Sequence, residues 1–213
     1  MENCTLLLLK PRERIIGTAR DLFRKHGIRG IGVDAIAEAA GTNKMTLYRH
    51  FGSKDELVAE CLRDVAREVE EMWAEVETAH PGDTLAQLRA WLRCAAEYKT
   101  QDDCRGCDMA NAAVELTETD HPARQVIEDF KRKQRDRIVR LAREGGIDDA
   151  ELLADTVFLL LEGARVSRQS VGAEGPAAHF MTSAEAVIAS FLLKSRGRVT
   201  VAKRKTKAPA SVR

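Results

Sequence analysis

The stretch GIRGIGVDAIAEAAGTNKMTLYRHFGSKDEL, residues 27–57, decides how this chain folds. Its first half carries apolar residues at helical spacing over residues 33–40, which predicts a short helix. Gly41 suits the left-handed backbone conformation that ends a helix sharply, because a residue without a Cβ atom adopts it at little steric cost. Asn43 is a good N-cap for a second short helix over residues 44–50. Two short helices joined by so tight a turn are typical of the helix-turn-helix arrangement that reads DNA.

The second helix of this motif has one apolar side and one polar side. Leu47 and Phe51 lie on the apolar side and are expected to pack into a core. After the helix, Ser53 and Glu56 have the spacing of a capping box, in which each side chain accepts the other residue's backbone N–H. The polar, partly cationic side suits a helix laid in the major groove of DNA. It carries Lys44, Thr46, Tyr48, Arg49 and His50.

The run IAEAAG, followed after a short turn by MTLYRHFGSKDEL, resembles the N-terminal domain of the TetR family of bacterial transcriptional regulators. The resemblance is specific over roughly Arg12 to Arg63, and elsewhere it extends only to length and helical rhythm. Two positions depart from the family's pattern. Gly32 stands where a Ser or Thr commonly caps the first helix of the motif, and Thr42 stands where an apolar residue is common. The resemblance implies a DNA-binding regulator of transcription.

The resemblance also implies roles for individual residues. Residues 44–46, at the start of the second helix, would meet base edges, since a lysine can donate to guanine and a methionine or threonine can touch a thymine methyl group. Residues 48–50 would contact phosphates, and so would Lys54 at the start of the next helix. The full expected DNA-binding set is Thr42, Asn43, Lys44, Met45, Thr46, Tyr48, Arg49, His50 and Lys54.

Composition restricts the remaining possibilities. The 213 residues have a net charge of +1, which conceals an acidic middle: residues 1–60 carry +2, residues 61–193 carry −9 and residues 194–213 carry +8. An acidic body disfavours non-specific DNA binding, while basic ends suit phosphate contact. No apolar run approaches a membrane span and no signal peptide is recognised, so no membrane association is expected. Five widely spread cysteines indicate a reducing cytoplasm.

Helical spacing continues through the rest of the chain, and no segment alternates as a strand does. The fold class is therefore all-α, with about nine helices. They are expected over residues 12–26, 33–40, 44–50, 54–79, 84–99, 106–116, 120–144, 150–171 and 177–194.

Three regions follow from these helices. An N-terminal arm and helix-turn-helix domain is expected over residues 1–53, and a helical ligand-binding and dimerisation domain over residues 54–194. A basic, disordered tail is expected over residues 195–213. This tail either is simply solvated or adds a contact with DNA that is independent of sequence.

One recognition helix gives little specificity, so the resemblance implies a homodimer that places two of them in successive major grooves. Its expected interface is formed by the helices over residues 150–171 and 177–194, because residues 157–161 are apolar almost all round. The alternative is an ordinary central core helix.

The resemblance further implies a pocket in the larger domain for a small, largely apolar effector, with Asn111 or Tyr98 as its polar group. Each candidate lining residue has plain core packing as its alternative. The candidates are Trp91, Cys94, Tyr98, Met109, Asn111, Phe130 and Phe158.

Cys104 and Cys107 form a C-x-x-C pair, which can hold zinc or form a redox couple. No second pair and no nearby histidine pattern completes a metal site, so packing is the simpler role for Cys107. Motifs of nucleophilic, nucleotide-dependent or phosphate-binding enzymes are missing, so no enzyme activity and no cofactor are expected. The predicted function is a ligand-responsive repressor that binds a near-palindromic operator. The alternatives are an activator of the same family and a thiol- or metal-responsive regulator.

Overall fold

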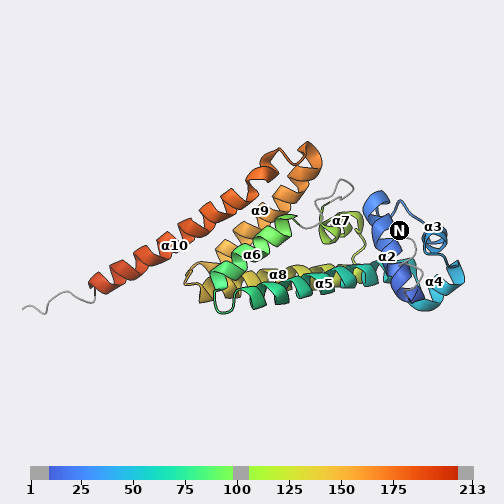
Figure 1. The fold of residues 1–213 in the computed structure, drawn as a ribbon, viewed down its shortest axis with the longest axis horizontal. Helices are drawn as coiled ribbons and strands as arrows, with labels where there is room; N and C mark the ends of the chain where they lie inside the picture. The colour runs from blue at the N-terminus through green and yellow to red at the C-terminus, as the bar shows by residue number, and fades with distance from the viewer. Residues whose placement is uncertain (1–9, 98–105, 206–213) are drawn as a thin grey trace, which may run out of the picture. The chain divides into compact units, whose positions relative to one another are not determined.

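The computed structural model describes residues 10–97 and 106–205, with side chains described as far as Ser195. Over these residues the chain forms nine α-helices, one 3-10 turn and no strand, which confirms the all-α prediction (Figure 1). The elements are α2 (Pro11–His26), α3 (Val33–Ala39), α4 (Lys44–Phe51), α5 (Lys54–Ala79), α6 (Thr84–Glu97), α7 (Asp108–Glu115), α8 (Pro122–Glu144), α9 (Ala150–Val171), η1 (Pro176–His179) and α10 (Phe180–Lys205).

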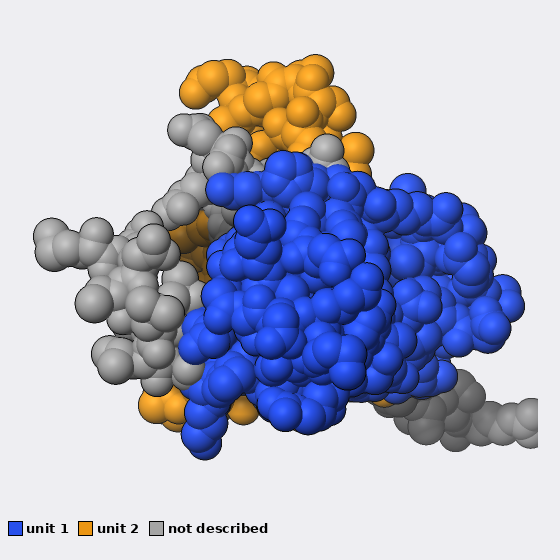
Figure 2. All heavy atoms as spheres, turned by 90° about the vertical axis from the view of Figure 1, so that its right-hand side faces the viewer, with its two compact units in different colours: residues 1–72, 99–132 blue, residues 73–98, 133–213 orange. Residues whose placement is uncertain are grey.

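The chain divides into two compact units, which Figure 2 colours separately. Unit 1 takes the described parts of Met1–Met72 and Lys99–Arg132, and unit 2 takes those of Trp73–Tyr98 and Lys133–Arg213. The division passes through α5 and α8, so each of these two helices contributes one part to each unit. It differs from the boundary expected after residue 53, because α7 and the start of α8 pack onto α5 within unit 1.

Unit 1 is built on two clusters of buried apolar side chains. The first joins α2, α3 and α4 to the start of α5, and the buried faces predicted from the sequence supply it. Its members are Ile15, Ile16, Ala19, Ile36, Ala37, Ala40, Leu47, Phe51, Leu57 and Cys61. The second joins α5, α7 and α8, and it contains Ile28, Val58, Ala59, Leu62, Val65, Met109, Ala112, Leu116, Ala123 and Ile127. The helix-turn-helix therefore shares α5 with a second layer of helices.

Unit 2 contains α6, α9 and α10, together with the end of α5 and the second part of α8. The α6, α9 and α10 helices contact one another in pairs. At the end of α5 the buried residues are Trp73, which is 1% exposed, and Val76, whereas Met72 is half-buried. The helical spacing of apolar residues predicts that Met72 faces the core. In the structure the indole of Trp73, the next residue, faces the core instead. Other fully buried side chains of unit 2 are Leu88, Leu92, Ile138, Leu141, Ile147 and Leu153.

The last helix, α10, is longer than the sequence predicts. It continues to Lys205, whereas disorder is expected from residue 195, and residues 206–213 lie outside the described part. The basic extension contains no proline, the residue that most strongly ends a helix. One described segment, Pro176–Ser195, is also long and apolar enough to cross a membrane, by length and composition only. A helix that buries one face in a protein core meets the same criterion, and α10 buries Ala184 and Ile188 completely.

Candidate nucleic-acid interface

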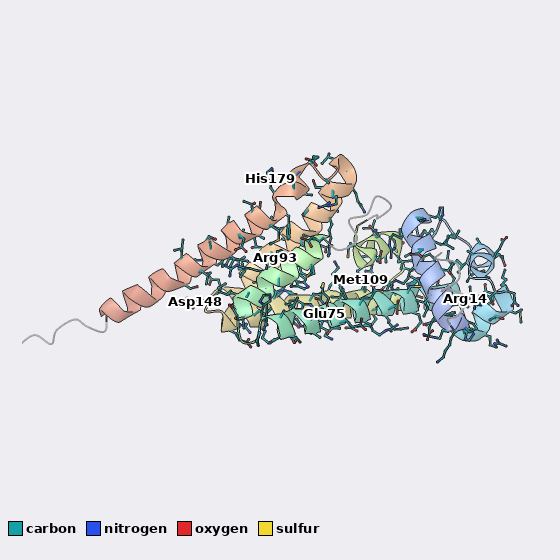
Figure 3. All side chains as sticks on the ribbon, in the orientation of Figure 1. Arg14, Glu75, Arg93, Met109, Asp148 and His179 are labelled. Atoms are coloured by element: carbon teal, nitrogen blue, oxygen red, sulfur yellow. The ribbon has the colours of Figure 1, made fainter. Side chains whose placement is uncertain are left out.

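The turn between α3 and α4 is fixed by backbone hydrogen bonds and by one remote arginine. Gly41 has the left-handed φ of +61° that the sequence predicts, and Thr42 N–H donates to the Ala37 carbonyl oxygen at 2.9 Å. From α2, Arg14 Nε donates to the Ala40 carbonyl oxygen at 2.9 Å (Figure 3). The last carbonyl groups of a helix have no partner within the helix, so Arg14 supplies one and ties α2 to the turn. Gly32, at the start of α3, contributes no side-chain cap.

Both predicted caps around α4 form, one of them in part. Asn43 Oδ1 accepts the Thr46 N–H at 2.9 Å, as expected of an N-cap. After the helix, Ser53 Oγ accepts the Glu56 N–H at 3.0 Å. The other hydrogen bond of the predicted capping box, from the Ser53 N–H to the Glu56 side chain, is replaced. The Ser53 N–H donates to the Phe51 carbonyl oxygen instead, at 2.8 Å.

The outer face of α4 carries most of the residues expected to bind DNA. Leu47 and Phe51 anchor the opposite face in the core, where they are 0% and 6% exposed. Met45, by contrast, is 78% exposed although it is apolar, and an exposed apolar side chain at a helix start suits contact with a base methyl group. Arg49 and His50 are exposed near the end of the helix, and Thr42 and Thr46 are half-buried. All of these side chains except Thr42, which lies in the preceding turn, are brought together on one short helix.

Lys44 is exposed and already engaged by a carboxylate. Its Nζ lies 3.1 Å from Asp34 Oδ2 on α3, and this hydrogen bond raises the pKa of the Lys44 ammonium. The lysine therefore stays charged and is held at the N-terminal end of α4. Because an ammonium has three N–H donors, Lys44 can keep this partner and still donate to a base.

Lys54 is placed differently from the expectation. Its Nζ donates to the Ile28 carbonyl oxygen at 2.6 Å, and the side chain is half-buried. Burial lowers the pKa of this ammonium. The nearby carboxylates of Asp55 and Glu115 raise it, but by less, so the net shift is downward. Lys54 thus points into unit 1, where it ties α5 to the loop between α2 and α3, and it is not available as a phosphate contact in this conformation. The sequence could not reveal this because Ile28 is remote along the chain.

Ion pairs hold α2 against α5 within unit 1. The Arg20 guanidinium contacts Glu68 through two parallel hydrogen bonds of 2.6 and 2.7 Å, and it also donates to Asp64. Burial lowers the pKa of Arg20, but these hydrogen bonds outweigh it and the net shift is upward. Paired bonds of this kind fix orientation as well as distance. The sequence shows these charges only as solvent-facing helix positions, so it does not predict the contact.

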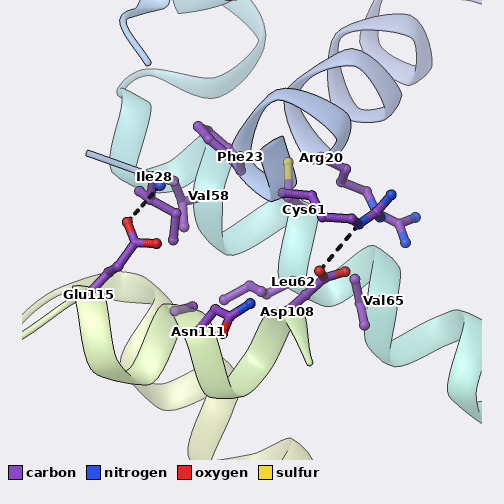
Figure 4. Close-up of a pocket in the computed structure, with 12 residues that line it drawn as sticks. Arg20, Phe23, Ile28, Val58, Cys61, Leu62, Val65, Asp108, Asn111 and Glu115 are labelled. Carbon is purple, nitrogen blue, oxygen red and sulfur yellow. Dashed lines mark hydrogen bonds and ion pairs between the residues drawn. The ribbon is translucent and has the colours of Figure 1, made fainter. Parts of the chain in front are cut away.

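A cavity lies where α2, α5 and α7 meet in unit 1 (Figure 4). The cavity is small, with a volume of about 40 Å³. Around it, Arg24 Nε lies 3.5 Å from Asp108 Oδ1, and Glu115 Oε2 accepts the Ile28 N–H at 2.7 Å. The polar rim of the cavity therefore joins α7 to α2 and to the loop that follows it. The apolar wall consists of Phe23, Ile28, Val58, Leu62 and Val65.

The residues expected to line an effector pocket fall into both units. Asn111 lines the cavity of unit 1, Met109 is completely buried in the second cluster of the same unit, and Phe130 packs against that cluster. Trp91, Cys94 and Phe158 belong to unit 2, where Trp91 is 3% exposed and the other two are half-buried. Tyr98 lies outside the described residues.

The thiol pair expected at residues 104 and 107 is described only in part. Cys107 is half-buried at the start of α7, and Cys104 lies outside the described residues. Within the described ranges, no three His, Cys, Asp or Glu side chains are grouped so as to hold a metal ion.

Comparison with known proteins adds to this geometry. Residues 15–61 match the family model described as bacterial regulatory proteins, tetR family. The chain is 32% identical over 96 residues to HTH-type transcriptional regulator AcrR of Shigella flexneri, with 45% of each chain covered. It is 27% identical over 116 residues to HTH-type transcriptional regulator LmrA of Bacillus subtilis, which covers 54% of this chain and 61% of that protein. The chain thus spans about half the length of the curated relatives it matches.

Solved structures cover more of the chain. A TetR-family transcriptional regulator from Streptomyces coelicolor has 26% sequence identity and a TM-score of 0.80, covering 85% of this chain and 96% of its own. A regulator from Streptomyces avermitilis has 27% identity and a TM-score of 0.72, covering 86% and 98%. The similarity therefore extends through the larger, C-terminal part of the fold and is not limited to the helix-turn-helix.

Proposed function

Because this chain belongs to the TetR family of bacterial regulatory proteins, we propose that it regulates transcription by binding a near-palindromic DNA operator as a homodimer, and that it acts as a repressor. The observation that carries this proposal is the outer face of α4, which presents exposed polar and cationic side chains on a helix anchored by Leu47 and Phe51. The matched relatives are transcriptional regulators, in agreement with the expectation that the chain is not an enzyme.

The α4 helix enters the major groove with its N-terminal end towards the bases. Lys44, Met45 and Thr46 then select the sequence, while the side chains near the end of the helix fix the register on the phosphates. Tyr48 (36% exposed), Arg49 and His50 serve this second role. Thr42 and Asn43 hold the turn, and Asn43 acts mainly through its cap on Thr46.

The homodimer forms through α9 and α10. Leu152, Leu159 and Val166 lie seven residues apart on α9 and are 56%, 73% and 59% exposed. An apolar stripe with this period packs against another helix at a shallow angle. Val171 on α9 and Leu193 on α10 are also exposed, so five of the eight exposed large apolar side chains in the described residues lie on these two helices. A second copy of the chain is the partner that covers them.

The regulator responds to an effector bound among the helices of unit 2. Support comes from α5, a continuous helix of 26 residues that contributes to both units. A helix shared in this way transmits a displacement at one end to the other, where Leu57 and Cys61 lie in the same buried cluster as Leu47 of α4. A change of a few ångströms between two recognition helices is sufficient to prevent both from entering successive grooves. The protein acts in the cytoplasm, where the operator lies.

The test is fluorescence anisotropy of the purified chain with DNA from upstream of its own gene and with a scrambled control. The expected result is binding at least roughly a thousandfold tighter to the upstream DNA, with two subunits per site. Equal and weak binding to both DNAs, followed by the failure of a random-sequence selection to enrich any site, would contradict it. Transcription from the bound promoter in vitro then separates repression from activation.

A further inference from the structure

Two buried hydrogen-bond donors among the described residues of unit 2 have no partner. Trp91 Nε1 on α6 and Gln134 Nε2 on α8 are both solvent-inaccessible and both unpaired, in side chains of residues only 3% and 2% exposed. A buried donor without an acceptor costs about 1–3 kcal/mol. Native proteins retain few of them, and those that occur require a cause such as a bound molecule. Two in one cluster of side chains point to a missing acceptor.

The orientation of the Gln134 amide is determined by its other neighbour. Trp73 Nε1 donates to Gln134 Oε1 at 2.6 Å, and an indole N–H can only donate. The amide oxygen must therefore face Trp73, and the NH₂ group is the one left unpaired. The Trp73 and Trp91 rings stack in turn, with centroids 5.1 Å apart and planes inclined by 11°. The two unpaired donors thus belong to one connected cluster of α5, α6 and α8.

The chemistry of this cluster restricts what can bind to it. Both donors are neutral, and the fully buried polar side chains described in unit 2 are Gln87, Gln134 and Ser195, none of which carries a charge. A charged group brought into such surroundings would lose its hydration without a buried counter-charge. The Arg137 guanidinium does lie 4.8 Å from the Trp73 ring centre, but the residue is partly exposed and water screens its charge. A neutral acceptor is therefore favoured.

We propose that the effector is an uncharged, largely apolar molecule whose carbonyl or similar acceptor binds the N–H groups of Trp91 and Gln134. This inference rests on the proposed function, in that it identifies the chemical class of the effector. Stacked indoles supply the apolar surface, and the two N–H groups select for an acceptor. A hydrocarbon of the same shape leaves both donors unpaired and binds more weakly.

The chain provides its own probe, because Trp73 and Trp91 are its only two tryptophans. The full chain with ¹⁵N-labelled indoles gives one N–H resonance from each, and each can be followed while a ligand is added. Acetophenone and ethylbenzene are suitable ligands, since they have the same skeleton and differ in the carbonyl oxygen. Acetophenone is expected to shift the Trp91 N–H resonance strongly and the already bonded Trp73 resonance weakly. Ethylbenzene is expected to bind about tenfold less tightly.

Two variants separate recognition from packing. Trp91→Phe keeps an aromatic ring and removes the unpaired N–H, so it should reduce acetophenone affinity about tenfold, to the level of ethylbenzene. It should lower the thermal midpoint of the ligand-free protein less than Trp73→Phe does, because both variants lose the same ring volume but only Trp73→Phe loses a hydrogen bond. Trp73→Phe is the matched control: it removes an N–H that has a partner, so it should lower the thermal midpoint.

Three results would overturn the proposal. One is equal binding of the two ligands, and another is no binding of acetophenone at millimolar concentration. The third is a long-lived water molecule detected against the Trp91 N–H that no ligand displaces, since that water would be the missing acceptor. All three are measured without DNA, so they are independent of the operator experiment, and failure of operator binding would leave the ligand result standing.

Discussion

At the scale of single residues, the left-handed glycine of the turn gives the sharpest prediction. An added Cβ at Gly41 meets nothing within 4 Å, so any cost of Gly41→Ala comes from the backbone φ of +61° alone. That conformation costs an alanine about 1–2 kcal/mol, and the variant should be destabilised by this amount in urea unfolding. Gly17→Ala is the matched control, because Gly17 lies inside α2 with equal space around its Cβ position. It should be stabilised by about 0.5–1 kcal/mol.

The two ends of α4 should respond differently to substitution. Lys44→Ala removes a donor to base edges, so it should reduce the preference for the operator over base-pair variants by about 1–3 kcal/mol at the position read. Tyr48→Ala should weaken binding to all sequences alike, because a phosphate contact carries no sequence information. Anisotropy with the operator and a set of single base-pair variants distinguishes the two effects. The reverse pattern would show that the roles are exchanged. Asp34→Asn, which releases Lys44, serves as the control for the ion pair.

Residue-scale features were predictable where their cause is local. The Asn43 cap and the Gly41 turn connect residues within five positions, and the sequence predicts both. The sequence did not predict three contacts whose partners are 26 to 61 positions apart. These are the hydrogen bonds of Arg14 with the Ala40 carbonyl, of Lys54 with the Ile28 carbonyl and of Gln134 with Trp73. The sequence does contain one indication of the role of Gln134. This polar residue lies on the apolar face of α8 between Ile127 and Ile138, where burial requires a hydrogen-bond partner.

At the scale of helices, the contact of α2 with α5 predicts a dependence on pH. Partial burial raises the pKa of the Glu60 carboxyl, but hydrogen bonds from Arg63 and Arg12 outweigh it and lower that pKa below its ordinary value of 4.5. A carboxyl whose pKa is lowered by folding stabilises the protein above 4.5, and this contribution is lost as the pH falls through the folded-state pKa. Glu60→Gln should therefore cost about 0.5–1 kcal/mol at pH 7.

The difference from the unsubstituted chain should shrink as the pH falls below 4.5, which urea unfolding at a series of pH values measures. Glu75→Gln, at an exposed position on the same helix, is the control and should change stability little at any pH (Figure 3). A Glu60→Gln penalty that stayed constant down to pH 3 would assign the effect to packing instead of charge.

Helix positions were predictable to within a few residues, since apolar periodicity and the capping residues are local signals. The predicted bounds of α5 and α9 agree with the structure, whereas α7 and α8 each begin two residues later than expected and α10 continues to Lys205. Trp73 is buried in place of Met72 because its ring stacks on the Trp91 ring. The apolar periodicity of α5 alone does not reveal which residue that neighbour will contact. The position of α4 was predictable to within one residue, because its apolar and polar faces are separated in the sequence itself.

At the scale of the whole molecule, the division into units follows long-range packing that the sequence does not display. Residues 106–132 join unit 1 through contacts such as Glu115 with the Ile28 N–H, 87 positions apart. The expected domain boundary after residue 53 depended on a local signal, the start of α5. A continuous helix has no break at which one unit ends, so its sequence offers nothing to mark the division.

Dimerisation is the property of the whole molecule that one substitution can test. Leu159 is 73% exposed in the single chain, so Leu159→Glu should not disturb the core, yet it places a charge in the proposed interface at a cost of several kcal/mol. Light scattering at micromolar concentration should give the mass of one chain, 23.6 kDa, for this variant and twice that mass for the unsubstituted protein. Val114→Glu, at an apolar position of α7 that is 80% exposed, is the control and should remain dimeric.

The monomeric Leu159→Glu variant should keep only weak, salt-dependent DNA binding, because specificity requires two recognition helices held one helical turn apart. A dimeric Leu159→Glu variant with full operator affinity would exclude this face of α9 from the interface.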